Sequence, residues 1–140
     1  MASEATAFVL DSFALLAYLQ GEAGQPIVEN ILAGAEAGDH TVSMSLINLG
    51  ELLYIIEREQ GLIAAQQTLA AVDQLPVAIE PVSRATVLAA AHLKALHSIS
   101  YADAFAAGAA RDHGAVLVTG DPEFEPLVKA GLIQVQWLPR

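Results

Sequence analysis

Four acidic residues stand at positions where folding could gather them into one site. Asp11 and Asp121 each follow a short apolar run, and Glu51 and Asp103 lie among apolar neighbours with no basic residue close by in the sequence. Partly buried carboxylates are costly unless they are paired or bound to a metal. Several carboxylates in one place would suit a hard divalent cation such as Mg²⁺, which takes oxygen ligands and serves the hydrolysis of phosphate esters.

Each acid also has an ordinary structural explanation. Asp11 could cap a following helix, and Asp121 with Pro122 makes a strong helix start by itself. Ser100 and Asp103 approximate a capping box. The fourth acid could simply face solvent. A site is therefore indicated only if the four lie together.

The elements that must position these acids alternate between strand and helix. Apolar runs predict strands over residues 8–10, 41–44, 77–79, 115–118 and 134–138. Helical periodicity and capping signals predict helices over residues 13–20, 25–37, 46–60, 62–74, 83–97, 100–113 and 123–129. This alternation predicts a three-layer α/β fold with a mainly parallel sheet of about five strands, in a single domain of residues 1–140.

In a parallel sheet, binding sites lie in the crevice beyond the carboxyl ends of the strands. Asp11 and Asp121 would leave two strands at that edge, a helix start there could supply Asp103, and an early helix turn could supply Glu51. Two unit charges about 4 Å apart repel by about 4 kcal/mol at an effective dielectric near 20. Converging carboxylates would therefore destabilise the fold or take up protons, unless a divalent cation binds them.

The composition points to a soluble, cytoplasmic protein. The opening residues carry an acid and lack the basic and long apolar regions of a signal peptide. No uncharged apolar run approaches the roughly 20 residues that a membrane helix needs. The absence of cysteine excludes disulfides and thiolate metal sites. Only 6 basic residues face 16 acidic ones, so a strong basic footprint for nucleic acid is missing.

Four stretches carry a family resemblance when they are taken together and in order. They are VLDSFALLAYLQGE (9–22), SLINLGELLY (45–54), SISYADAFAAGAA (98–110) and VLVTGDPEF (116–124). The chain resembles the PIN-domain nucleases, in particular the VapC-like toxins of type II toxin–antitoxin modules. The resemblance spans nearly the whole chain and implies a PIN-like fold.

The resemblance also implies a catalytic site. Its acidic quartet, which would bind one or two Mg²⁺ or Mn²⁺ ions, is formed by Asp11, Glu51, Asp103 and Asp121. Asp11 and Asp103 would be the principal ligands, and the other two would complete the site directly or through waters. Thr119 and Ser12 would orient the ligands and waters around the metal.

The implied reaction is hydrolysis of an RNA phosphodiester bond by metal-activated water. The implied partners are the RNA substrate, a small antitoxin protein that covers the acidic groove, and a second copy of the chain in a homodimer. The apolar helical stretches 24–37 and 46–74 could supply the antitoxin surface or could only face the core. Arg111 and Lys94 are candidates for contacting phosphate.

Two other functions stay open. A phosphatase or phosphoryl-transfer protein could use Asp11 as its nucleophile, although Phe13 stands where a second aspartate would be expected. The chain could also be a catalytically silent PIN-like module that serves as a binding partner or scaffold. Glu22 and Glu123 lie outside the quartet, and Glu123 is a remote candidate for the metal shell.

Overall fold

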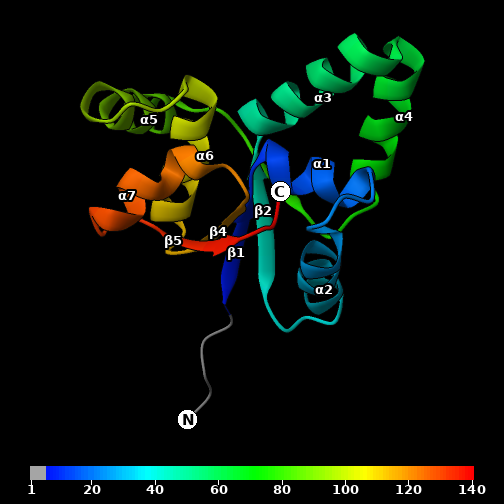
Figure 1. Cartoon of the computed structure of the whole chain (residues 1–140), viewed down its shortest axis with the longest axis horizontal. Coiled ribbons are helices and arrows are strands. Elements are labelled where there is room, and N and C mark those ends of the chain that lie inside the picture. Colours follow the sequence, from blue (N-terminus) through cyan, green and yellow to red (C-terminus); the bar gives the residue numbers. More distant parts are fainter. Residues whose placement is uncertain (1–5) are drawn as a thin grey trace.

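Parallel strands in the order β3-β2-β1-β4-β5 form the central sheet of this chain (Figure 1). The structure is a computed structural model that describes residues 6–140. Its strands are β1 (Ala7–Leu10), β2 (Thr41–Ser45), β3 (Ala78–Glu80), β4 (Val116–Thr119) and β5 (Gln134–Trp137). Each adjacent pair is parallel. The predicted α/β fold with a parallel sheet of about five strands is confirmed.

The helices of the described residues follow the predicted order. They are α1 (Ser12–Leu19), α2 (Gln25–Glu36), α3 (Leu46–Gln60), α4 (Leu62–Val72), α5 (Arg84–Leu96), α6 (Tyr101–Asp112), the 3₁₀ helix η1 (Pro122–Phe124) and α7 (Glu125–Lys129). Most predicted ends differ from these by one or two residues, as expected where helices and strands fray. Within residues 6–140, no helix combines the length and the apolar character needed to cross a membrane.

The helix predicted over residues 123–129 is split into η1 and α7. Pro126 has no N–H, so it cannot donate the α-helical bond to the Pro122 carbonyl. The Glu125 N–H donates to that carbonyl instead, which makes the first turn a 3₁₀ turn. Glu123 is the middle residue of this 3₁₀ turn.

Helices cover both faces of the sheet, as the three-layer prediction requires. Leu10 of β1 belongs to a core that includes side chains of α1, α2, α3 and α4. Its neighbour Val9 belongs to a second core, built with α5, α6 and α7. Successive strand residues point to opposite faces, so this one strand contributes to both cores.

The strand order places the carboxyl ends of β1 and β4 side by side. From β1 the chain moves outward to β2 and β3, then returns to β4 on the other side of β1. Such a reversal opens a crevice at the carboxyl edge of the sheet. Asp11 follows β1, and Asp121 lies just beyond the end of β4. Ser45 caps α3 and Ser100 caps α6, the helices that carry the other two acids.

Candidate metal centre

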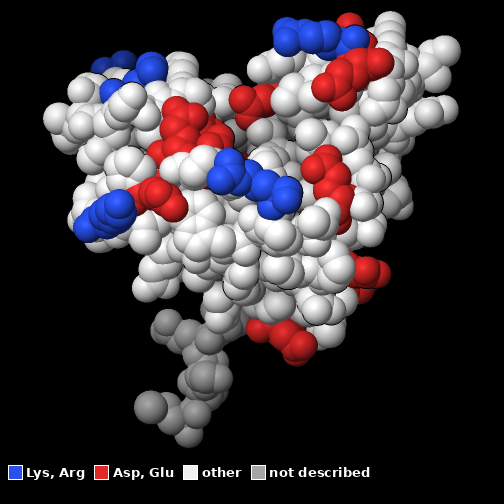
Figure 2. All heavy atoms as spheres, viewed as in Figure 1, with Lys and Arg blue, Asp and Glu red and all other residues white. Residues whose placement is uncertain are grey.

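An open cleft of about 320 Å³ lies where β1 and β4 end. All four acids predicted from the sequence line it, together with Ser12 and Glu123. Figure 2 shows acidic side chains on both sides of the hollow in this face of the molecule. The tertiary structure therefore brings the predicted quartet to one cleft.

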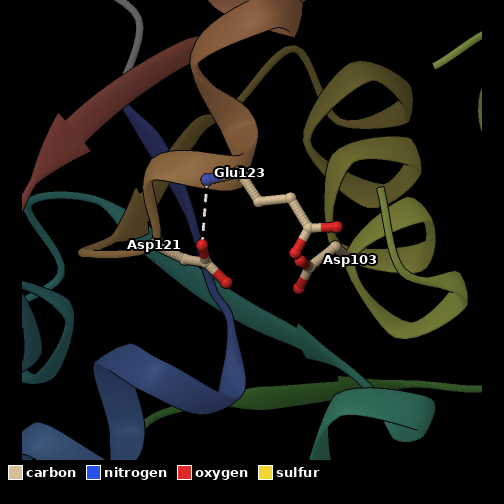
Figure 3. A group of neighbouring side chains, drawn as sticks. All are labelled: Asp103, Asp121 and Glu123. Carbon is tan, nitrogen blue, oxygen red and sulfur yellow. Dashed lines mark hydrogen bonds between the residues drawn. The ribbon is translucent and has the colours of Figure 1, made fainter. Parts of the chain in front are cut away.

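The carboxylates of Asp103, Asp121 and Glu123 approach one another most closely (Figure 3). Each offers one oxygen, and these three oxygens all lie within 4.8 Å of one another. Asp103 is buried in the first turn of α6, where its backbone N–H donates to the Ser100 hydroxyl at 3.0 Å. That cap uses only the backbone of Asp103, so the carboxylate is left to face the other two acids.

Glu123 lies in the 3₁₀ turn η1, two residues after Asp121. The Glu123 N–H donates to Asp121 Oδ1 at 2.9 Å, so Asp121 caps η1 while it lines the cleft. Asp121 can therefore cap η1 and belong to the candidate metal centre at the same time. From the sequence, Glu123 was only a remote candidate for the metal shell, since an acid after Asp121-Pro122 is ordinary at a helix start. The spacing of Pro122 and Pro126 was the signal for a tighter turn.

Asp11 lies deepest of the acids, with 2 % of its surface exposed. Its Oδ1 accepts from the Ala14 N–H at 2.8 Å, as the N-cap of α1. Its Oδ2 accepts from the Thr119 hydroxyl, and that hydroxyl oxygen accepts from the Asp121 N–H at 3.0 Å. Thr119 thus connects the two acids that follow β1 and β4.

Glu51 is held by the other polar residue that was expected beside the metal. The Ser12 hydroxyl donates to Glu51 Oε1 and so connects α1 with α3. Glu22, whose role was open, is not among the residues that line the cleft. The two polar contacts, Thr119 to Asp11 and Ser12 to Glu51, each fix the orientation of one acid.

No lysine or arginine of residues 6–140 forms an ion pair with the cleft acids. The ion pair found in that part of the chain joins His113 to Glu80 at 3.5 Å. Arg111 donates to the Leu132 carbonyl, and Lys94 donates to a carbonyl in the loop before α6. Within residues 6–140, no basic side chain therefore pairs directly with these carboxylates.

Burial and crowding shift the titration of two cleft acids. Burial raises the pKa of Asp11 from 3.8 to about 7, although hydrogen bonds from Thr119 and Ala14 oppose the shift. Burial also raises the pKa of Asp103 from 3.8 to about 8, assisted by a hydrogen bond with Glu123 and by neighbouring carboxylate charges. Without a cation, these two carboxyl groups hold protons near neutral pH.

The donor set fits a hard divalent cation. The clustered ligand atoms are all carboxylate oxygens, and neither a histidine nitrogen nor a sulfur accompanies them. Oxygen ligands without nitrogen or sulfur favour Mg²⁺ or Mn²⁺ over softer metals. Asp103, Asp121 and Glu123 are therefore a group that could bind such a metal ion.

Gly120 is packed closely against Phe13, a residue that lines the cleft, and leaves no space for a larger side chain. A Cβ at this position would lie 2.4 Å from Phe13 Cε1 and 3.1 Å from the Leu138 carbonyl oxygen. We expect Gly120→Ala to lower the free energy of unfolding by about 1–3 kcal/mol, because the Phe13 ring, which lines the cleft, must shift. Urea denaturation measures this change.

Gly50 provides the matched control for that variant. It lies in α3 beside Glu51, and a Cβ there would meet no atom within 4 Å. Gly50→Ala should raise the free energy of unfolding by about 0.5–1 kcal/mol, because alanine loses less backbone entropy than glycine in a helix. Equal effects of the two variants would contradict the close contact inferred at Gly120.

Comparisons with known proteins agree with this geometry. The family model of the PIN domain matches residues 8–129. VapBC2 from Rickettsia felis, solved with a DNA fragment from its promoter, is 18% identical and covers 96% of this chain and 100% of its own, with a TM-score of 0.73. VapC20 of Mycobacterium tuberculosis, described as a sarcin–ricin loop cleaving toxin, is 22% identical to this chain, with a TM-score of 0.71. The match covers 92% of this chain and 98% of VapC20.

DNA-bound VapBC from Salmonella typhimurium is 21% identical to this chain and covers 94% of it and 97% of its own length, with a TM-score of 0.69. At these identities the solved structures show a shared fold. No curated protein sequence matches the chain significantly.

Proposed function

This chain belongs to the PIN-domain family, and from that premise we propose that it is a metal-dependent ribonuclease, the toxin of a toxin–antitoxin system. The observation that carries the proposal is the group formed by Asp103, Asp121 and Glu123 in an open cleft. One oxygen of each lies within 4.8 Å of the other two, and none of the three forms an ion pair with a residue of 6–140. The RNA-cleaving VapC20, which shares the fold, supports RNA as the substrate.

The cleft acids would hold one or two Mg²⁺ or Mn²⁺ ions. Asp103, Asp121 and Glu123 would bind directly, and Asp11 and Glu51 would complete the site directly or through waters. When bound, such a cation supplies a water of lowered pKa as the nucleophile and neutralises charge that develops on the phosphate. Asp11 and Asp103 must give up their protons for this binding, since ligand carboxylates are ionised.

The surrounding residues would keep the acids in place. Thr119 donates to Asp11 Oδ2, and Ser12 donates to Glu51 Oε1, so each acid presents a defined face to the cleft. Both oxygens of Asp11 already accept hydrogen bonds from within the chain. Each oxygen keeps a second lone pair, which stays available to a cation or a water.

The proposed protein partners are a small antitoxin and a second copy of the chain. The relatives from Rickettsia felis and Salmonella typhimurium were crystallised as VapBC complexes. Of the two apolar stretches predicted as a possible antitoxin surface, α2 buries its apolar residues Val28, Ile31 and Leu32 in the core. The α3–α4 stretch leaves five large apolar side chains exposed: Leu46, Tyr54, Leu62, Ile63 and Leu69. We propose this second stretch as the antitoxin surface.

Metal binding is expected to stabilise the protein and to switch on RNA cleavage. A cation at about 100 times its dissociation constant adds roughly 2.7 kcal/mol, which is on the order of 10 °C in Tm for a chain of this length. The measurement compares protein in EDTA with protein in Mg²⁺ or Mn²⁺, first by thermal denaturation and then with RNA.

The outcomes separate the candidate functions. The absence of a shift with either ion would refute the metal site. A shift without cleavage of any RNA would favour the silent binding module. An acyl phosphate on Asp11 would favour the phosphoryl-transfer protein.

A further inference from the structure

A buried amide lies directly behind the candidate metal centre. Asn48 is in the first turn of α3, one helical turn before Glu51 and two before Ile55, and both of those residues line the cleft. This spacing puts the three on one face of the helix. Asn48 is fully buried. It lies on the side of α3 that carries Glu51 and Ile55, but unlike them it does not line the cleft.

The Asn48 side chain connects the helices that carry two of the cleft acids. Its Nδ2 donates to the Ala102 carbonyl at 3.1 Å, across 54 residues of sequence. Ala102 directly precedes Asp103 in the first turn of α6. Among the side-chain hydrogen bonds of residues 6–140, this one alone joins α3 to α6.

The same side chain carries an unsatisfied polar atom. Asn48 Oδ1 is buried and has no hydrogen-bond partner, and no other side-chain atom of the described residues is in that state. A buried acceptor without a partner lowers stability, whereas an apolar side chain of the same shape has no such cost. This cost opposes the stabilisation from the Nδ2 hydrogen bond to Ala102, so the amide contributes little net stability. The unsatisfied oxygen calls for a further explanation.

We propose that Asn48 is a positioning residue that fixes the separation of Glu51 and Asp103 across the cleft. Two packed helices can slide by small amounts, because apolar contacts have no direction. A hydrogen bond has a defined length and angle, so it fixes where the first turn of α6 stands against α3. This role rests on the proposed metal-dependent function, since it concerns how well the acids are placed for a cation.

The test compares metal affinity with stability in Asn48→Leu. Leucine has the same number and branching of side-chain heavy atoms but no polar atom. The urea midpoint in EDTA should stay unchanged or rise, while the Mg²⁺ dissociation constant, taken from the metal-dependent shift in Tm, should rise about tenfold or more. Asn48→Ala removes the same amide and supplies the metal measurement if leucine does not fit.

Leu49→Ala is the matched control in the same helical turn. Leu49 is buried in the core on the other side of α3, so its truncation should lower the urea midpoint and leave the Mg²⁺ dissociation constant within about twofold of wild type. Asn48 variants that bind Mg²⁺ as tightly as wild type would overturn the positioning role while the nuclease proposal stands. A wild-type protein without any Mg²⁺ or Mn²⁺ response would overturn the nuclease proposal itself, and with it the role of Asn48.

Discussion

Asp103→Asn is expected to abolish metal-dependent RNA cleavage and, at the same time, to make the metal-free protein more stable at pH 8. The loss of cleavage follows because Asp103 belongs to the group of three carboxylates within 4.8 Å. An amide carries no charge to hold the cation. We expect the rate of RNA cleavage to fall by more than about 100-fold. Even the mutation of a residue that only orients a metal ligand typically lowers metal affinity or activity by about 10–100-fold.

The gain in stability has a separate cause. Burial and neighbouring acids raise the pKa of Asp103 to about 8, so ionising it in the folded, metal-free protein is unfavourable. Each pKa unit corresponds to about 1.4 kcal/mol. An uncharged asparagine avoids this cost, and we expect a gain of at least about 2 kcal/mol, or roughly 5 °C or more in Tm.

Two variants complete the experiment. Asp11→Asn should lose cleavage in the same way, because Asp11 lines the same cleft. Glu125→Gln removes an exposed acid of α7 that does not line the cleft, and should change neither cleavage nor stability appreciably. If cleavage persisted in both aspartate variants, the catalytic site would lie elsewhere.

The second large effect is the pH dependence of the metal-free protein. The pKa values of Asp11 and Asp103 in the folded state, about 7 and about 8, lie above their ordinary value of 3.8. Between pH 3.8 and these raised pKa values, the folded state binds more protons than the unfolded state. Their contribution to stability is therefore fully present below about pH 4 and is lost as the pH rises to about 8.

Urea denaturation in EDTA at several pH values between 5 and 8 measures this loss. The Asp11→Asn, Asp103→Asn double variant lacks both titrating groups, so its stability should fall much less over the same range. Saturating Mg²⁺ should also remove most of the fall in the wild type, because the cation replaces the protons that the acids release. A wild-type profile that runs parallel to that of the double variant would refute the raised pKa values.

The helices and strands were largely predictable from the sequence because their signals are local. Ser45 and Ser100 were expected to begin helices, and each caps one through a backbone N–H two or three residues later. All five strands were predicted, with ends that differ by at most one residue. The departure at residues 122–129 also has a local cause, since Pro126 cannot make the bond that an α-helix needs there.

The candidate site was predictable in its members but not in its arrangement. The sequence singled out the four acids by their apolar surroundings and their places after strands, and all four line one cleft. The family resemblance implied Thr119 and Ser12 as orienting residues, and each donates a hydrogen bond to one of the acids. Whether these residues are metal ligands and orienting groups stays a prediction.

The order of elements, the edge of the sheet where the acids gather, and the residue types that gather there could all be predicted from the sequence. That Glu123, rather than Asp11, shares the closest group with Asp103 and Asp121 became known from the fold. It alone also placed the Asn48 amide against the Ala102 carbonyl. The physical reason is that capping and apolar periodicity act between neighbours along the chain. The direction of a side chain across a cleft depends instead on how helices far apart in sequence pack together.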